Sequence, residues 1–262
     1  MSRTAKLLPF TNVAPNSVAT LSLPPGDTYE RITLKLGGTT FTKAHITGIR
    51  VRMNQKVISE CTGPDLDAMN SYTSLASDPT MLTIDFSELF ARDQLGQSVG
   101  AIGTLSGVAS LMLEVDIGPA TAPTLQAYAQ VSGPKPLAVL NKLLRYPVNI
   151  GGAGKWPVAL PYGQNGSIIK RVYIKSNNMT ALEIKKNGIT YHDSDKAINE
   201  FWQKENKCVP QPGWYVFDPI ADKNLGDMLS TADAQTFEFN VTMSAAEAIT
   251  VYVEYIDLFE NL

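Results

Sequence analysis

The sequence predicts an all-β protein of two similar modules, with short helices in the connecting loops. Two observations carry this prediction. Short segments in which apolar and polar residues alternate recur along the 262 residues, and each ends at a turn rich in glycine, proline or asparagine. Several of these segments also match segments about 130 residues further on, in the same order. Alternation with a period of two is typical of strands with one buried face, and repetition at one long spacing indicates duplicated modules.

The predicted strands are short and are separated by turn clusters such as Pro24–Asp27, Asn187-Gly188 and Pro212-Gly213. This texture favours antiparallel sheets. In chain order, the strands are predicted at residues 32–36, 49–53, 81–86, 111–117, 125–131, 172–174, 182–184, 237–241 and 249–256.

Helical patterns are few. One short helix is predicted over residues 65–72. A second is predicted over residues 197–202, where Ala197, Ile198, Phe201 and Trp202 share one face. Neither is long enough to cross over between parallel strands, so a doubly wound parallel sheet is not expected.

The repeat is clearest over residues 46–55, which align with residues 179–188 at a threonine, two apolar strand positions and an asparagine. The duplication predicts one module over residues 1–131 and a second over residues 137–262, joined by the Pro/Gly linker 132–136. Three further matches keep the order: Leu23–Gly26 with Leu160–Gly163, Ala68–Tyr72 with Ala197–Phe201, and Leu95-Gly96 after Phe86 with Leu225-Gly226 after Phe217.

Composition excludes several classes of protein. There are 22 Lys and Arg against 25 Asp and Glu, a net charge of −3, which argues against a dedicated DNA or anionic-membrane binder. Cys61, Cys208, His45 and His192 are far apart in the sequence, so neither a disulfide framework nor a zinc site is expected. We expect two buried, reduced thiols. The apolar run at residues 7–10 is too short for a signal peptide.

One motif would support a hydrolase. Residues 96–100 match G-x-S-x-G, the nucleophile elbow of α/β-hydrolases, with Ser98 as nucleophile and Asp116 and His192 as its partners. The elbow requires a strand before the serine and alternating strands and helices around it, and neither is predicted here. A serine hydrolase using Ser98 is therefore the alternative, and no catalytic residue is assigned.

Two loops resemble ligand-binding loops. Residues 151–156 are rich in glycine and contain Lys155, but Asn149 and Trp156 occupy positions where a phosphate loop needs glycine and Ser or Thr. Oxygen ligands that could hold Ca²⁺ gather in one loop, although their spacing matches no EF-hand: Asp218, Asp222, Asn224 and Asp227.

Two further sets of residues, one basic and one aromatic, are candidates for ligand binding. Lys142, Arg145 and Lys155 make a mild basic cluster near the linker, which we interpret as a solvated face. The three tryptophans could stack on sugars, giving a carbohydrate-binding β-sandwich as a further alternative, although packing roles are favoured for them. They are Trp156, Trp202 and Trp214.

Two tandem β modules with no catalytic constellation suit a subunit that builds a shell, since viral capsid domains are eight-stranded jelly rolls. The sequence resembles the double jelly-roll major capsid proteins of tailless, membrane-containing icosahedral bacteriophages, of the corticovirus type. The likeness covers nearly the whole chain. It is carried by Asn12–Ala14, Leu23–Glu30, Ile49–Val51, Gly118-Pro119, Pro123–Gln130 and Ile249–Tyr255.

The resemblance implies a structural, non-enzymatic protein of two tandem eight-stranded jelly rolls with short helices in the connecting loops. It implies homotrimers of pseudo-hexagonal outline that tile the capsid of the virion over an internal membrane, assembled in the host cytoplasm. Neighbouring capsomers, vertex or penton proteins and membrane proteins are the implied partners, with no specific nucleic-acid binding. Residues 1–6, with Arg3 and Lys6, would form an arm facing the membrane. Calcium is associated with such capsids, but no ligand residue is carried over and no cofactor is assigned.

Overall fold

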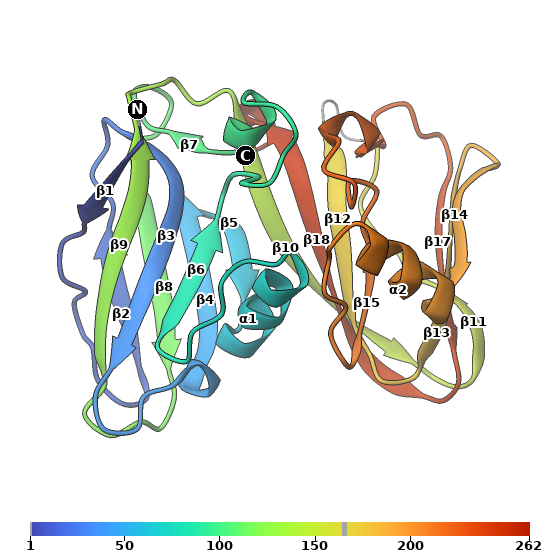
Figure 1. The fold of residues 1–262 in the computed structure, drawn as a ribbon, viewed down its shortest axis with the longest axis horizontal. Coiled ribbons are helices and arrows are strands. Elements are labelled where there is room, and N and C mark those ends of the chain that lie inside the picture. Colours follow the sequence, from blue (N-terminus) through green and yellow to red (C-terminus); the bar gives the residue numbers. More distant parts are fainter. Residues whose placement is uncertain (1, 164–166) are drawn as a thin grey trace. The chain divides into compact units, whose positions relative to one another are not determined.

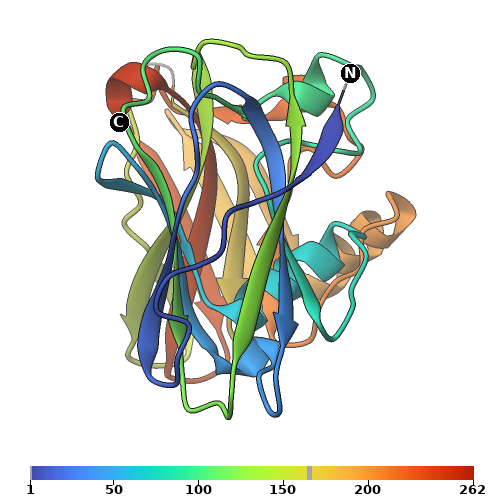
Figure 2. The same cartoon turned by 90° about the vertical axis from the view of Figure 1, so that its left-hand side faces the viewer.

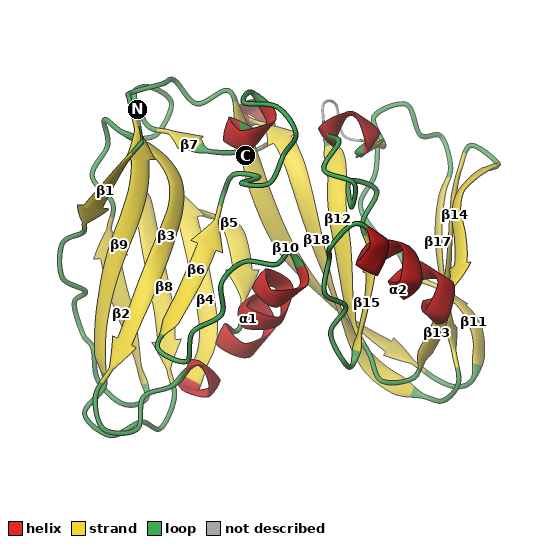
Figure 3. Cartoon of the chain, viewed as in Figure 1, coloured by secondary structure: helices red, strands yellow, loops and turns green. Residues whose placement is uncertain are grey.

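The computed structural model describes residues 2–163 and 167–262. Strands dominate this part of the chain, and the helices lie in the connections (Figures 1 and 3). It divides into two compact units: the chain up to Leu144, and Arg145–Asn261 together with Tyr72–Ser74. No helix in the described ranges is long and apolar enough to cross a membrane.

The first unit is a sandwich of two sheets (Figure 2). Its strands are β1 (Arg3–Lys6), β2 (Ser17–Ser22), β3 (Thr28–Gly37), β4 (Ile46–Met53), β5 (Lys56–Cys61), β6 (Met81–Asp85), β7 (Ile102–Gly103), β8 (Leu111–Ile117), β9 (Thr124–Ser132) and the first part of β10 (Val139–Ile150). One sheet has the order β1-β9-β3-β6, with β7 also on β3; the other has the order β10-β5-β4-β8-β2. All these pairings are antiparallel except that of β10 with β5, which meet at Leu143 and Ser59.

The core of the first unit follows the alternation in the sequence. Along β8, every second residue from Leu111 to Ile117 is buried, and the residues between them are half-buried. β9 alternates in the same way from Leu125 to Val131. Because successive side chains point to opposite faces of a strand, these residues fill the space between the sheets.

The second unit repeats the design. Its strands, besides the end of β10, are β11 (Gly154–Pro157), β12 (Ile168–Lys175), β13 (Met179–Lys186), β14 (Ile189–Asp195), β15 (Trp214–Phe217), β16 (Leu229–Ser230), β17 (Phe237–Met243) and β18 (Glu247–Leu258). One sheet has the order β15-β12-β18-β10, with β16 also on β12, and the other has the order β11-β17-β13-β14.

The helices follow equivalent hairpins. The β4–β5 hairpin leads into α1 (Gly63–Tyr72), and the β13–β14 hairpin leads into α2 (Lys196–Glu205). Short 3-10 turns occur elsewhere, at Lys43–His45, Gly96–Ser98, Leu225–Asp227 and Phe259–Asn261.

The hairpin turns show that the repeat is structural. Asn54 and Gln55 have φ of 48° and 71°, and Asn187 and Gly188 have φ of 52° and 78°. Both turns therefore have two central residues in the left-handed region, the geometry that matches the twist of a hairpin. In each copy the asparagine amide donates to one carbonyl and its oxygen accepts from two backbone N–H groups of the loop before the next long strand. The repeat predicted from residues 46–55 and 179–188 is thus present in space.

Candidate functional site

The residues of the alternative hydrolase triad each have another partner. Ser98 ends a 3-10 turn in a loop, and its hydroxyl donates to the carbonyl of Leu95 at 2.9 Å. Arg50 donates to both carboxylate oxygens of Asp116, at 2.7 and 2.6 Å. His192 contacts the hydroxyl of Tyr215 through Nε2 at 2.9 Å. With no strand leading into Ser98 and no helix after it, these residues do not form a nucleophile elbow.

The glycine-rich segment is a turn between β10 and β11 that runs into β11, and not a phosphate loop. Gly154–Pro157 forms β11, which pairs with β17. Lys155 binds Glu183 at 2.5 Å, and the indole of Trp156 donates to the carbonyl of Gly152 at 2.9 Å. Lys155 contributes to holding the pKa of Glu183 at about 2. The lysine is therefore committed to an ion pair between strands.

The other scattered candidates have structural roles. Cys61 and Cys208 are free thiols and both are buried, as predicted, and burial raises the pKa of each. Lys142 is also buried, so the basic cluster is not a single solvated face. Trp214 is buried and stacks on Tyr252 with ring centroids 6.2 Å apart, which leaves it no face for a sugar.

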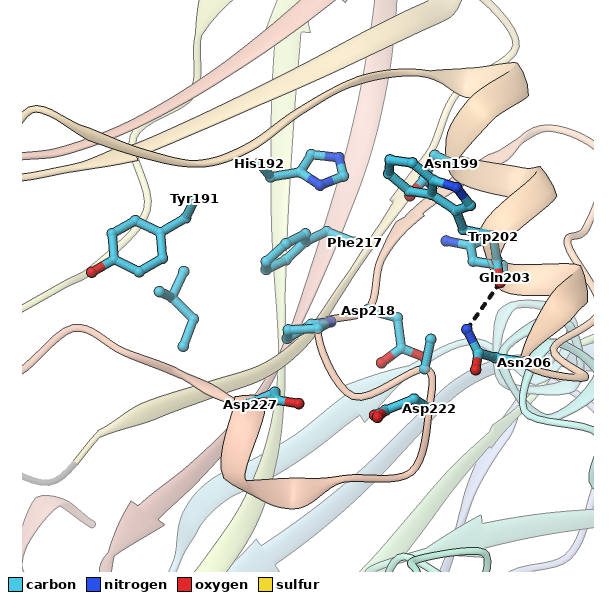
Figure 4. A pocket seen from close by; sticks show the side chains of 13 residues that line it. Tyr191, His192, Asn199, Trp202, Gln203, Asn206, Phe217, Asp218, Asp222 and Asp227 are labelled. Carbon is cyan, nitrogen blue, oxygen red and sulfur yellow. Dashed lines mark hydrogen bonds between the residues drawn. The ribbon is translucent and has the colours of Figure 1, made fainter.

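The second unit contains a cavity of about 390 Å³ between α2, β14 and the loop after β15. We call it the α2 pocket. Aromatic rings form one part of its wall, amide side chains of α2 another, and aspartates of the loop a third (Figure 4). Its lining includes Tyr191, His192, Asn199, Trp202, Gln203, Asn206, Phe217, Asp218, Asp222 and Asp227.

The aspartates that line the pocket belong to the loop that the sequence predicts to offer oxygen ligands. Asp218 is held by Arg171, whose Nε lies 3.1 Å from Oδ1, and by the hydroxyl of Tyr72 at 3.1 Å from Oδ2. Asp227 accepts from the amide of Asn224 at 2.9 Å. In the described residues, no three His, Cys, Asp or Glu side chains are grouped closely enough to hold a metal ion. The aspartates Asp218, Asp222 and Asp227 make one side of the cavity acidic.

His192 is neutral over most of the pH range. Tyr215 donates its hydroxyl hydrogen to the carbonyl of Ser194 at 3.1 Å, so His192 must donate to that hydroxyl from a protonated Nε2. The ring also packs edge-on against Phe217, with centroids 5.1 Å apart. Burial lowers the pKa of His192 to about 4, against a smaller opposing effect of Asp193. The negative charge of the pocket is therefore not offset by an imidazolium at neutral pH.

The helix beside the pocket has its apolar side outward. Ile198, Phe201 and Trp202 have 44%, 55% and 55% of their surface exposed; we call them the α2 outer face. The buried side of α2 is polar, with Asn199 and Gln203 both buried. The sequence places the apolar residues on one face of a helix but does not tell that this face points to solvent.

A second group of exposed apolar residues lies in the first unit. Leu89, Phe90 and Leu95 are 41%, 42% and 78% exposed, and Arg92 lies exposed among them. We call residues 89–95 the β6 loop, because they follow β6 in the chain. Large exposed apolar side chains so close together in the sequence are typical of a contact surface.

Two family models match the chain. Residues 4–132 match the model of the viral coat protein P2 N-terminal domain, and residues 140–259 match that of the viral coat protein P2 C-terminal domain. No curated protein matches the sequence.

Solved structures agree with the fold. The major capsid protein P2 of bacteriophage PM2 superposes with a TM-score of 0.91 at 23% identity, with 98% of each chain covered. A chain of Sulfolobus turreted icosahedral virus gives 0.71 at 14% identity, covering 98% of this chain and 91% of that one. The Faustovirus major capsid protein gives 0.59 at 8% identity, covering 98% and 90%. These likenesses confirm the predicted fold of two tandem jelly rolls.

Proposed function

Because this chain belongs to the viral coat protein P2 family, it is a structural capsid protein of the virion and not an enzyme, and we propose that it builds the shell as a homotrimer. Neither alternative, the Ser98 hydrolase or the carbohydrate-binding protein, is supported. The family is matched along both halves of the chain, so the capsid role applies to the whole subunit.

The observation that carries the trimer is the duplication itself. Two similar jelly rolls in each of three copies give six similar sides around a three-fold axis, an outline that packs into a hexagonal lattice. We assign residues 1–131 and 137–262 to the two jelly rolls and 132–136 to the link. The end of one family model at residue 132 and the start of the next at residue 140 support this division.

The finer partners are part of the proposal. A closed icosahedral shell needs other proteins at its five-fold vertices, because a six-sided tile does not fit there. We propose contact with an internal membrane as well, through the segment that starts with Arg3. In support of this, Arg3–Lys6 forms an edge strand on β9, and both Arg3 and Lys6 are exposed.

The mass of the purified chain in solution tests the trimer. We expect three chains per particle by sedimentation equilibrium or light scattering, and electron microscopy of concentrated material should show flat particles with six-fold appearance. A stable monomer at all concentrations would contradict the trimer.

A further inference from the structure

The orientation of α2 is unusual for a helix on the surface of a folded unit. Such helices normally turn an apolar stripe to the core and charged residues to water. In α2 the residues facing the unit are Asn199 and Gln203, whereas Ile198, Phe201 and Trp202 face outward. An outward apolar side of this kind marks a surface that another molecule covers.

Specific bonds hold the helix in this orientation. The side-chain amides of Asn199 and Gln203 both donate to the carbonyl of Val216, at 2.8 and 2.7 Å. Asp195 caps the N-terminus by accepting from the N–H of Ile198 at 2.9 Å. Turning the apolar side inward would break both bonds to the carbonyl of Val216 and remove the cap at Asp195 from its present geometry.

The α2 pocket adjoins the outer face and gives it a charge preference. Trp202 belongs to both, so its indole offers a flat surface at the edge of a cavity that also contains Asp222 and Asp227. A guanidinium stacks on indole rings and binds carboxylates with paired hydrogen bonds. The cavity, at about 390 Å³, is large enough for a side chain of that size.

We propose that the α2 outer face and the α2 pocket bind the β6 loop of a second copy of this chain within the trimer. This inference rests on the proposed trimer and names its contact. A three-fold contact is head-to-tail, so it joins two different surfaces of the same chain. Leu89, Phe90 and Leu95 would pack against the outer face, and Arg92 would enter the pocket.

The complementarity of the two surfaces supports this choice of partner. Six of the fifteen large exposed apolar side chains of the described part lie in the two stretches that make these surfaces, residues 89–95 and 198–202. The α2 outer face lies next to the pocket that Asp222 and Asp227 line, and the β6 loop carries Arg92 among its apolar residues. Matching apolar area and opposite charges favour contact between copies over contact with an anionic lipid surface, which the aspartates would repel.

Substitution at the centre of the outer face tests the proposal. Phe201→Glu should raise the dissociation constant of the trimer roughly hundredfold, as truncation of a central interface aromatic does, while the circular dichroism spectrum stays that of the folded chain. Lys204→Gln, on the same helix but off the outer face, is the control and should leave the trimer unchanged. A wild-type trimer that Phe201→Glu does not weaken would overturn the proposal. A wild-type monomer would instead contradict the proposed function.

A charge exchange tests the counterpart. Arg92→Glu should weaken the trimer, and Arg92→Glu combined with Asp222→Arg should restore part of the affinity. If Arg92→Glu has no effect while Phe201→Glu dissociates the trimer, the β6 loop is not the partner.

Fluorescence quenching tests the contact without altering α2, so misfolding of the helix cannot confuse the result. In Trp156→Phe the tryptophans left are Trp202 and Trp214, and Trp214 is already buried, so the signal accessible to acrylamide reports on Trp202. Acrylamide quenching should fall as trimers form. Unchanged quenching in the trimer would also overturn the proposal.

Discussion

The two helices α1 and α2 occupy the same place in the repeat, and each buries an asparagine, but only α1 also buries apolar side chains. Each follows a hairpin with the same asparagine-led turn. In α1, Leu66 and Met69 are buried at 6% and 5% exposure, whereas the buried side of α2 is made of amides. The difference shows that the repeat fixes where a helix lies along the chain, while its side chains decide which side meets the core.

This difference suits a subunit that must meet its neighbours. In the first unit the apolar side chains of α1 pack against the unit itself, and their burial adds to its stability. The second unit holds its helix by hydrogen bonds and leaves the apolar side for contact. The following predictions test how far the two copies differ.

The largest difference is expected when one apolar residue is removed from each helix. Leu66→Ala should lower the free energy of unfolding by about 2–5 kcal/mol, because it leaves a cavity in the first unit. Ile198→Ala should cost less than about 0.5 kcal/mol in dilute solution, where the residue is exposed. Urea unfolding of both variants measures this.

Protein concentration separates the two variants further. The loss in Leu66→Ala should be the same at every concentration, whereas the loss in Ile198→Ala should grow with the fraction of trimer, since only bound copies bury Ile198. Equal, concentration-independent losses would show that both helices are packed in the same way.

Acid should destabilise the second unit through His192. The pKa of this residue is lowered from 6.5 to about 4 in the folded chain, so between these values the unfolded chain binds a proton that the folded chain does not. Its contribution is complete above pH 6.5 and is lost as the pH falls towards 4, by up to about 3 kcal/mol. In the repeat alignment its counterpart is Ser59, which does not titrate.

His192→Gln is the matched variant, because an amide can still donate to the hydroxyl of Tyr215. The variant should lose less stability than wild type between pH 6.5 and 4, and carboxylates elsewhere affect both proteins equally. Parallel stability curves in this window would mean that His192 titrates normally.

Much of the fold is readable in the sequence because one face of most strands is buried. The predicted segments fall within β3, β4, β8, β9, β12, β13, β17 and β18 or overlap β6. Strands without clean alternation were not predicted: β14 is exposed on nearly every residue, and all of β11 is exposed. Their place in a sheet comes from pairing with distant strands, which a local pattern does not contain.

The site is harder to predict than the fold. The oxygen-rich loop around Asp222 and the apolar side of the second helix are both visible in the sequence. Their meeting in one cavity depends on bonds from Asn199 and Gln203 to Val216, which turn the helix. Periodicity shows that Ile198, Phe201 and Trp202 share a face, but it does not show which face of the helix points inward.

The two turn asparagines should give the most similar effects in the two units. Asn54→Ala and Asn187→Ala each remove one donated and two accepted hydrogen bonds and place alanine at φ of 48° or 52°. We expect each to cost about 2 kcal/mol in thermal or urea unfolding. The glycine variants should cost less, because glycine adopts positive φ freely and only the bonds are lost. A large loss of unfolding free energy in the Asn54 variant with almost none in the Asn187 variant would mean that the hairpins differ as the helices do. The two copies would then share a chain path, but equivalent residues would contribute differently to stability.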